Sequence, residues 1–283
     1  MTTTPLRVGS VPYLNADPLT FGLEGRSDVV LEHEVPSRLL EGLLARRYDC
    51  VFAPTFDVLQ HPGLRIIEGL CVGSRGPVDS VLLFSRCPLD EISTLALDTS
   101  SRSSAGLVQV LLAEATGRIP RTTRVAPDLS ALESHDAVLL IGDPALRVAA
   151  SQTEARVFDL GKLWHDLTGL PFVYALFVAR EQDHDAMDPT TSRDDATLTR
   201  LLHDSRDVGL RNLDLLARRA SEALDLPLPS LLVYLEERIQ YELGPPELEG
   251  ILAYRRLLVK HGLLDAAKGD AELRLMRAGS SAR

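Results

Sequence analysis

Hydrophobic residues follow two periodicities in this chain, and the two alternate over its first two thirds. Short continuous apolar runs are typical of buried β-strands, whereas the segments between them repeat apolar residues every three or four positions, as helices do. Such alternation predicts parallel sheets flanked by helices. Two of the predicted helices are 36–46 and 103–115. The predicted strands are 6–11, 48–53, 64–72, 78–84, 92–97, 122–125, 137–141, 156–160 and 172–178.

The last third of the chain has a different pattern. From about Asp195 onward it is rich in Leu, Ala, Arg and Glu, and no apolar run indicates a strand, so we expect helices throughout. The polar segment 181–195 that precedes it predicts a solvated connector. We expect the tail after Gly269 to be frayed.

The strands at 81–84 and 172–178 enclose a block with its own alternation of strands and helices. If this block is an inserted domain, the chain crosses between two lobes twice, and a ligand cleft lies between them, where small-molecule sites are common. We therefore predict a lobe 1 made of residues 1–84 and 178–283, and an inserted lobe 2 made of residues 85–177. The alternative is one continuous, doubly wound sheet.

Composition and charge narrow the class of protein. The formal net charge of −10 argues against nucleic acid and against an anionic membrane surface as partners. No apolar run approaches the roughly 20 residues of a membrane span, and the start of the chain lacks the pattern of a signal peptide. The three cysteines have no metal-ligand spacing, so we expect reduced thiols and a cytoplasmic location. The sequence does not indicate an oligomeric state.

Polar residues gather where the first strand ends, in the segment Tyr13-Leu14-Asn15-Ala16-Asp17-Pro18. Asp17 and Pro18 predict the N-cap and the first position of a helix. A strand that leads directly into a helix N-terminus points backbone N–H groups into the space beyond the strand, which favours an anionic ligand. An ordinary turn between strand and helix is the alternative.

A hydroxyl-rich segment, Asp98-Thr99-Ser100-Ser101-Arg102-Ser103-Ser104, precedes the helix predicted at 103–115. Hydroxyl groups and free N–H groups at a helix start, together with one arginine, can hold a carboxylate or a phosphate. Simple capping by Ser101 or Ser103 with a solvated Arg102 is the alternative. Because one cap needs fewer hydroxyl groups than this segment has, we favour anion binding.

Two further turns carry candidate residues. Ser80 follows the Gly76-Pro77 turn at a strand start, where its hydroxyl can face a cleft. Gly142 follows the strand at 137–141 and permits close approach of a ligand to the backbone, whereas Asp143 fits a helix cap better than a base. Trp164 and Phe172 fit a packing role better than a wall for a ring-shaped ligand.

Several catalytic motifs are missing from the sequence. It contains no P-loop, no Gly-x-Gly-x-x-Gly after a strand, no Gly-x-Ser-x-Gly and no metal-ligand pair of histidines or cysteines. We therefore predict neither a metal nor a cofactor. A site rich in hydroxyl, amide and N–H groups suits the binding of an anion better than acid–base catalysis by protein groups.

Five segments of the chain, in this order, resemble the chorismate dehydratase family, whose members begin the futalosine route to menaquinone. The resemblance runs from about Arg7 to Ala179. Tyr13 stands where some members of the family have Phe, and Pro144 stands where many have Ala. Neither difference affects the expected chemistry. The segments are Gly9-x-x-x-Tyr13-Leu14-Asn15-x-x-Pro18, Gly76-Pro77-Val78-x-Ser80, Ser101-Arg102-Ser103-Ser104, Ile141-Gly142-Asp143-x-Ala145-Leu146 and Trp164-x-x-x-Thr168-Gly169-Leu170-Pro171-Phe172-Val173.

The resemblance implies an α/β, two-lobed fold like that of type II periplasmic binding proteins, with a helical C-terminal portion. It implies the conversion of chorismate to 3-[(1-carboxyvinyl)oxy]benzoate with loss of water, in the cytoplasm. It places the family's amide on Asn15 and its serine on Ser80 as catalytic residues. The expected substrate-binding residues are Tyr13, Thr55, Ser101, Arg102, Ser103, Ser104, Gly142 and Asp143.

Our hypothesis for the chemistry is that the enolpyruvyl carboxylate of the substrate removes the ring proton, while Asn15 and Ser80 hold the geometry and hydrogen-bond the departing hydroxyl. One rival function is a solute-binding protein without catalysis, since the fold is shared. A second is the related 1,4-dihydroxy-6-naphthoate synthase, whose start motif differs and which relies on a histidine in its second lobe. Here His135 precedes the strand at 137–141 instead of following it.

Overall fold

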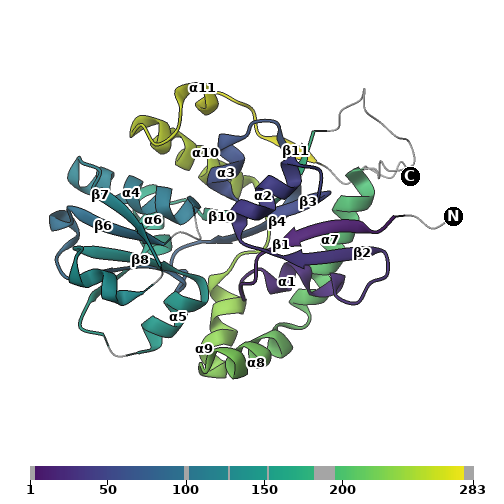
Figure 1. Ribbon diagram of the computed structural model, residues 1–283, viewed down its shortest axis with the longest axis horizontal. Helices are drawn as coiled ribbons and strands as arrows, with labels where there is room; N and C mark the ends of the chain where they lie inside the picture. The colour runs from purple at the N-terminus through teal and green to yellow at the C-terminus, as the bar shows by residue number, and fades with distance from the viewer. Residues whose placement is uncertain (1–3, 99–101, 127, 152, 182–194, 277–283) are drawn as a thin grey trace.

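The chain folds into two β-sheets, each flanked by helices, which lie side by side along the long axis of the molecule (Figure 1). The structure is a computed structural model that describes residues 4–98, 102–126, 128–151, 153–181 and 195–276. Most of the predicted connector at 181–195 lies outside the described residues. The predicted α/β class with two lobes is confirmed.

The larger sheet has six strands in the order β11-β4-β10-β3-β1-β2. The parallel alternation predicted from the sequence holds for β1, β2 and β3, whereas β10 runs antiparallel to both of its neighbours, β3 and β4. Strands β2 and β11 were not predicted. The strands are β1 (Leu6–Ser10), β2 (Val29–His33), β3 (Cys50–Pro54), β4 (Leu64–Ser74), β10 (Phe172–Arg180) and β11 (Arg274–Met276).

The smaller sheet has five strands in the order β7-β6-β8-β5-β9, and here β5 is antiparallel to β8 and β9. Its central strands are fully buried runs, as their continuous apolar sequences predict. The strands are β5 (Val81–Ser85), β6 (Thr94–Asp98), β7 (Arg121–Val125), β8 (Ala137–Ile141) and β9 (Arg156–Asp159).

The two crossings between the sheets lie earlier in the chain than the boundaries expected after residues 84 and 177. Strand β5 pairs with β8 and β9, so residues 81–84 belong to the smaller sheet. Strand β10 pairs with β3 and β4 along its length, so residues 172–177 belong to the larger sheet. Both strands are apolar runs without a local signal for their partners, because their partners come from distant parts of the chain.

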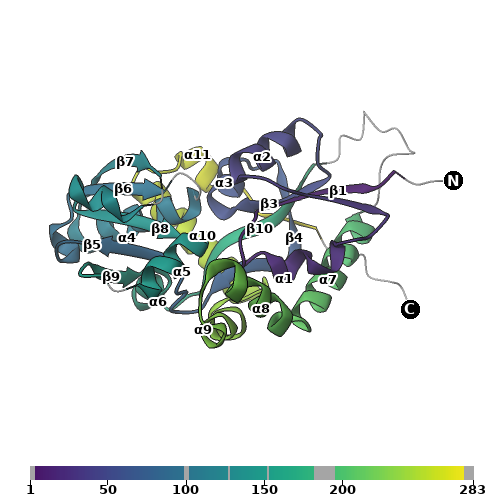
Figure 2. The same ribbon diagram turned by 60° about the horizontal axis from the view of Figure 1, so that its bottom comes forward.

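Helices cover both sheets, and the C-terminal ones join them. Helix α10 packs against both β10 and α4 and so connects the two sheets, while α8 and α9 lie below the region between them (Figures 1 and 2). The helical C-terminal portion is thus confirmed, except that β11 adds a short parallel strand to the edge of β4. The helices are α1 (Asp17–Thr20), α2 (Pro36–Leu44), α3 (Thr55–Gln60), α4 (Arg102–Thr116), α5 (Gly142–Ala150), α6 (Leu160–Thr168), α7 (Asp195–Leu210), α8 (Leu213–Leu224), α9 (Leu228–Val233), α10 (Pro245–Lys260) and α11 (Ala266–Gly269), with the 3-10 turns η1 (Phe21–Leu23), η2 (Leu89–Glu91) and η3 (Leu129–Glu133) and the π-helical turn η4 (Tyr234–Arg238).

An aromatic cluster packs where the second crossing meets α10. The rings of Trp164 and Phe172 have centroids 5.3 Å apart, and both contact Tyr254 edge-on. The indole N–H of Trp164 donates to the carbonyl of Pro171 at 3.1 Å, so the one polar group of this buried side chain is paired. Trp164 and Phe172 are fully buried, which confirms their predicted packing role.

Candidate active site

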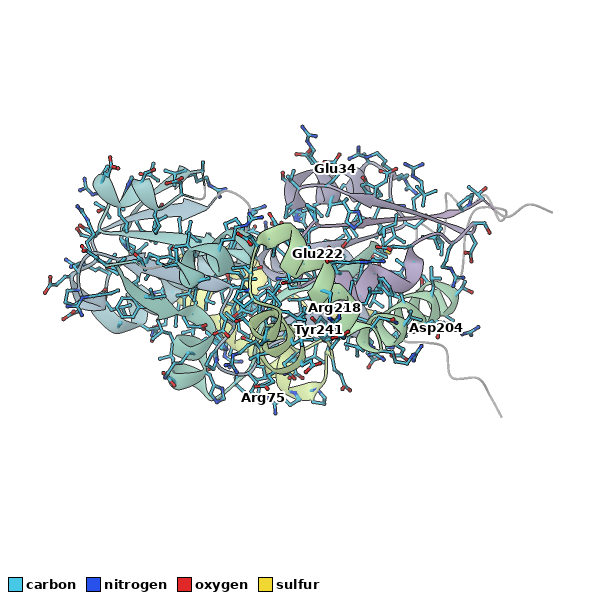
Figure 3. All side chains as sticks on the ribbon, turned by 90° about the horizontal axis from the view of Figure 1, so that it is seen from below. Glu34, Arg75, Asp204, Arg218, Glu222 and Tyr241 are labelled. Carbon is cyan, nitrogen blue, oxygen red and sulfur yellow. The ribbon has the colours of Figure 1, made fainter. Side chains whose placement is uncertain are left out.

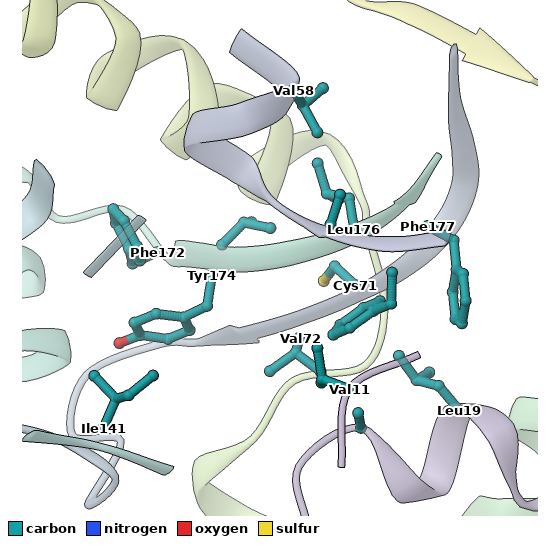
Figure 4. Close-up of a cluster of buried hydrophobic side chains, with 14 of the residues drawn as sticks. Val11, Leu19, Val58, Cys71, Val72, Ile141, Phe172, Tyr174, Leu176 and Phe177 are labelled. Carbon is teal, nitrogen blue, oxygen red and sulfur yellow. The ribbon is translucent and has the colours of Figure 1, made fainter. Parts of the chain in front are cut away.

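A cleft opens between the two sheets and encloses about 590 Å³ of space, part of which is open to solvent. Its wall is mostly apolar, and Figure 4 shows Val11, Val72 and Tyr174 from the larger sheet together with Ile141 from the smaller one. Hydroxyl and amide groups interrupt this wall. The lining residues are Val11, Tyr13, Asn15, Pro36, Phe52, Pro54, Val72, Val78, Ser80, Val81, Ser104, Ile141, Gly142, Tyr174, Ala175 and Ile239.

Five of the site residues expected from the sequence line this cleft. Tyr13 and Asn15 follow β1 of the larger sheet, whereas Ser80, Ser104 and Gly142 belong to the smaller sheet or to its helices. The fold therefore brings together residues that lie on either side of the first crossing, which runs between β4 and β5. Ser101 lies outside the described residues.

The crossing segment that carries Ser80 is held by charged side chains. The Asp159 carboxylate, at the N-cap of α6, accepts the backbone N–H groups of Val78 and Asp79 at 2.9 and 2.8 Å. Asp79 has a φ of 61°, a left-handed conformation that is unfavourable for a residue with a side chain. Arg238 pairs with the Asp79 carboxylate at 2.8 Å and ties this turn to η4. These contacts fix the position of Ser80.

Tyr234 joins the two residues that the sequence favours for catalysis. Its hydroxyl donates to Ser80 Oγ at 2.9 Å, and the Asn15 side chain also hydrogen-bonds the Tyr234 hydroxyl. Tyr234 is 2% exposed. Tyr234 is not among the residues predicted from the sequence, because an isolated tyrosine in a helical region does not reveal where its hydroxyl will find a partner.

Gly142 begins α5 with a φ of +59°, in the left-handed region that favours glycine. Its N–H donates to the carbonyl of Ser80 at 2.7 Å, and a Cβ atom there would lie 3.5 Å from the ring of Tyr13. Because 3.5 Å is an ordinary van der Waals contact, the positive φ requires the glycine and the space beside Tyr13 does not.

Replacing Gly142 with alanine should destabilise the protein by about 1–2 kcal/mol, because the left-handed backbone is strained for any residue with a Cβ. Equilibrium unfolding in urea measures the loss. The matched control is Gly63→Ala, at a glycine without positive φ and with open space around it, where we expect a change below about 0.5 kcal/mol. Equal losses in the two variants would contradict this interpretation.

Asp143 was expected to bind substrate, but it is not among the lining residues. Its carboxylate instead accepts the backbone N–H of Leu14, so a residue of the smaller sheet's α5 holds the turn that carries Asn15. Burial raises the pKa of Asp143. It also raises the pKa of Asp17, at the start of α1, to about 7, with the nearby Asp143 carboxylate as the second cause. Ala16 is the N-cap of α1, so Asp17 does not cap it as predicted.

Arg102 was also expected to bind the substrate, but it pairs with Asp57 of α3 instead. Its Nη1 lies 2.6 Å from Asp57 Oδ1, and its guanidinium stacks over the ring of Phe56 at 5.1 Å. Asp57 is 1% exposed, and burial raises its pKa to about 6. The Arg102 charge therefore serves an ion pair between α3 and α4, a partnership that the local sequence does not indicate.

Ser103 and Thr55 complete the expected set, and neither lines the cleft. Ser103 Oγ accepts the N–H of Phe56 at 3.1 Å, and its carbonyl accepts the Tyr254 hydroxyl at 2.9 Å, so this serine connects α4 to α3 and α10. Thr55 is fully buried at the start of α3, next to the lining residue Pro54, and its hydroxyl has no hydrogen-bond partner among the described residues.

The cleft is lined by neutral groups throughout the described part of the chain, since no Lys, Arg, His, Asp or Glu is among its lining residues. The described residues as a whole contain no cluster of three or more His, Cys, Asp or Glu side chains that could hold a metal ion. None of the described helices is both long and apolar enough to span a membrane. The chemistry available at this site is hydrogen bonding from hydroxyl, amide and backbone N–H groups.

Comparison with solved structures identifies the fold. A protein from Archaeoglobus fulgidus superposes with a TM-score of 0.70 at 15% sequence identity, covering 92% of this chain and 98% of that one. The alkanesulfonate-binding protein of Xanthomonas axonopodis pv. citri, solved with MOPS bound, gives a TM-score of 0.66 at 17% identity and covers 93% of this chain and 96% of that one. The chain thus has a periplasmic-binding-protein-like fold.

Comparison with known sequences identifies the family. Residues 6–260 match the family described as "Menaquinone biosynthesis". A chorismate dehydratase of Thermus thermophilus is 30% identical over 270 residues, which cover 90% of this chain and 95% of that protein. A chorismate dehydratase of Campylobacter jejuni is 27% identical over 60% of this chain and 65% of that protein. The chain therefore belongs to the menaquinone-biosynthesis family that includes these chorismate dehydratases.

Proposed function

We propose that this protein is a chorismate dehydratase, a hydro-lyase that converts chorismate to 3-[(1-carboxyvinyl)oxy]benzoate and water. The names of its relatives in Thermus thermophilus and Campylobacter jejuni support this function. The observation that carries it is that Asn15 and Ser80, from opposite sheets, line one cleft and share Tyr234 as hydrogen-bond partner. A cytoplasmic location is part of the proposal, because these relatives are biosynthetic enzymes.

The proposed reaction removes a ring proton and the neighbouring ring hydroxyl. The electron pair of the broken C–H bond forms a new ring double bond and the C–O bond breaks. The hydroxyl leaves as water with the proton that the base removed, which returns the base to its starting state. The product ring is aromatic, which makes the elimination strongly favourable. The enolpyruvyl carboxylate of the substrate is the proposed base, in keeping with a cleft in which no acidic or basic side chain is among the described lining residues.

Asn15 and Ser80 are the proposed catalytic residues. Negative charge builds up on the departing hydroxyl as the C–O bond breaks, and a preorganised hydrogen-bond donor stabilises such charge more than it stabilises the ground state. Holding the carboxylate base against the ring proton contributes further, since well-oriented intramolecular reactions gain up to about 7–11 kcal/mol. In this proposal the protein supplies orientation and donors, and the substrate supplies the base.

Chorismate carries two carboxylates, and neutral donors are proposed to bind them. Ser104 near the start of α4 and Tyr13 line the cleft and offer hydroxyl groups, and the backbone at Gly142 forms part of the same wall. The N-terminus of α4, a helix of 15 residues, adds a favourable dipole for an anion. Arg102, Ser103, Asp143 and Thr55 are proposed to support these groups from behind.

Incubating the purified protein with chorismate tests the function. We expect chorismate to disappear and one equivalent of the aromatic product to form, followed by its absorbance and identified by mass spectrometry. The fold likeness to the alkanesulfonate-binding protein favours one other candidate, a non-catalytic anion-binding protein. Tight binding of chorismate without any turnover would select that function and overturn ours. A histidine-dependent naphthoate synthase fits the site less well, since none of the described lining residues is histidine.

Replacing Ser104 with alanine should raise KM for chorismate about tenfold and leave kcat within about twofold, because a donor to a carboxylate that persists through the reaction contributes uniform binding. Steady-state kinetics measures both constants. Ser230→Ala, at an exposed serine on α9, is the matched control and should change neither. A large fall in kcat with unchanged KM would show that Ser104 acts in the transition state instead.

A further inference from the structure

The C-terminal helical portion supplies a residue to the centre of the site. Tyr234 begins η4, whereas Asn15 follows β1 and Ser80 precedes β5, so three distant segments meet at one phenol hydroxyl. Tyr234 is separated from Ser80 by 154 positions and is almost completely buried. A buried tyrosine hydroxyl needs a partner, but here both of its partners are proposed catalytic residues.

The backbone at Tyr234 has an unusual conformation. Helix α9 passes into a π-helical turn there, in which the N–H of Ile239 donates to the carbonyl of Tyr234 at 3.1 Å. Such turns are rare and occur frequently at functional sites. Within this turn Arg238 pairs with Asp79, next to Ser80, and Ile239 lines the cleft. One wide turn therefore places Tyr234, Arg238 and Ile239 against the same crossing segment.

The direction of the hydrogen bonds gives this contact a chemical meaning. A serine hydroxyl has one hydrogen and two acceptor sites, and Tyr234 donates to Ser80 Oγ at 2.9 Å. With that acceptor site occupied, the hydrogen of Ser80 is free to point into the cleft, which Ser80 lines. The Asn15 side chain hydrogen-bonds the same phenol, so the three groups form one connected chain, in which each bond strengthens the next.

We propose that Tyr234 is a positioning residue for the dehydration: its hydroxyl holds Ser80 Oγ so that the Ser80 hydrogen is directed at the departing hydroxyl of the substrate. The inference rests on the proposed function. It assigns Tyr234 no proton transfer, since the elimination balances with the substrate's own carboxylate as base. Burial raises the pKa of Tyr234, so the phenol stays protonated and remains a donor at neutral pH.

The test is Tyr234→Phe, which keeps the ring and removes only the hydroxyl. We expect kcat for chorismate to fall about 10–100-fold while KM changes less than about threefold, because the lost contact orients a transition-state donor. The matched control is Tyr241→Phe. Tyr241, labelled near the middle of the molecule in Figure 3, is also buried, but its hydroxyl has no hydrogen-bond partner among the described residues, so kcat should stay within about twofold.

A double-variant cycle separates positioning from a merely structural role. If Tyr234 acts through Ser80, then Tyr234→Phe should lower kcat several-fold less in a protein that already carries Ser80→Ala than in the native protein, and the fall that remains measures the contact with Asn15. An equal fall in the presence and absence of Ser80 would overturn the proposal, as would normal kcat in Tyr234→Phe alone. A native protein without turnover would overturn the proposed function itself, and the positioning role with it. Thermal unfolding of all variants verifies that folded proteins are compared.

Discussion

Replacing Asn15 with alanine should lower kcat for chorismate dehydration about 100–1000-fold and change KM by less than about fivefold. The expected size is that of removing one preorganised donor from a site where charge develops. Asn15 lines the cleft at the end of the β1 segment, and its side chain is held by the Tyr234 hydroxyl, so it enters the reaction already oriented. Steady-state kinetics with product detection measures the effect.

The matched control for Asn15 is Asn212→Ala. The Asn212 amide donates to the carbonyl of Val208 at 2.7 Å within the C-terminal helices and does not line the cleft, so we expect normal kcat and KM. If Asn15 only stabilises its turn, Asn15→Ala would keep near-normal turnover and lose stability instead. That result would remove Asn15 from the proposed mechanism and leave the family assignment intact.

The largest expected effect on stability concerns Asp17, a largely buried carboxylic acid. Asp143, from the opposite sheet's helix α5, and Glu24 act on it as negative neighbours, while Arg219 acts in the opposite direction. Burial is the main cause that raises the pKa of Asp17 to about 7, from an ordinary value near 3.8. The folded state therefore holds this proton at pH values where the unfolded chain has released it.

The sign of the pH dependence follows from this difference. Well below pH 3.8 Asp17 is protonated in both states and contributes no pH dependence. Between about pH 4 and pH 7 the unfolded state binds fewer protons than the folded state, so the free energy of unfolding falls as pH rises. Above about pH 7 both states are ionised, and the loss stays constant.

Replacing Asp17 with asparagine should therefore stabilise the protein at pH 8 by about 2–4 kcal/mol relative to the native chain, and by less than about 1 kcal/mol at pH 4. Urea unfolding at the two pH values measures the difference. The matched control is Asp214→Asn, at an exposed carboxylate paired with Arg218, where we expect less than about 1 kcal/mol at either pH. An advantage for Asp17→Asn that is equal at pH 4 and pH 8 would refute the role of this ionisation.

The sequence determined those elements that depend only on residues adjacent in the chain. The strand predicted at 137–141 has the same bounds as β8, because a continuous apolar run is visible in the sequence. The glycine that follows is visible too, and Gly142 has the positive φ that glycine tolerates. The missed strand β2 is only partly buried, and β11 has three residues, so neither gives a strong pattern. Resemblance to a known family, more than composition, pointed to Asn15 and Ser80.

Contacts between distant segments were decided only by the tertiary structure. Strands β5 and β10 are equally apolar, and which sheet each joins depends on partners far away in the chain. The sequence predicts that Arg102 binds an anion, but in the fold α3 places the buried Asp57 carboxylate against it. Tyr234 donates a hydrogen bond to Ser80, although 154 positions separate the two residues in the chain. Hydrophobic periodicity is a property of neighbours along the chain and so can be read from the sequence, whereas the partner of a buried polar group is selected by the packing of whole elements.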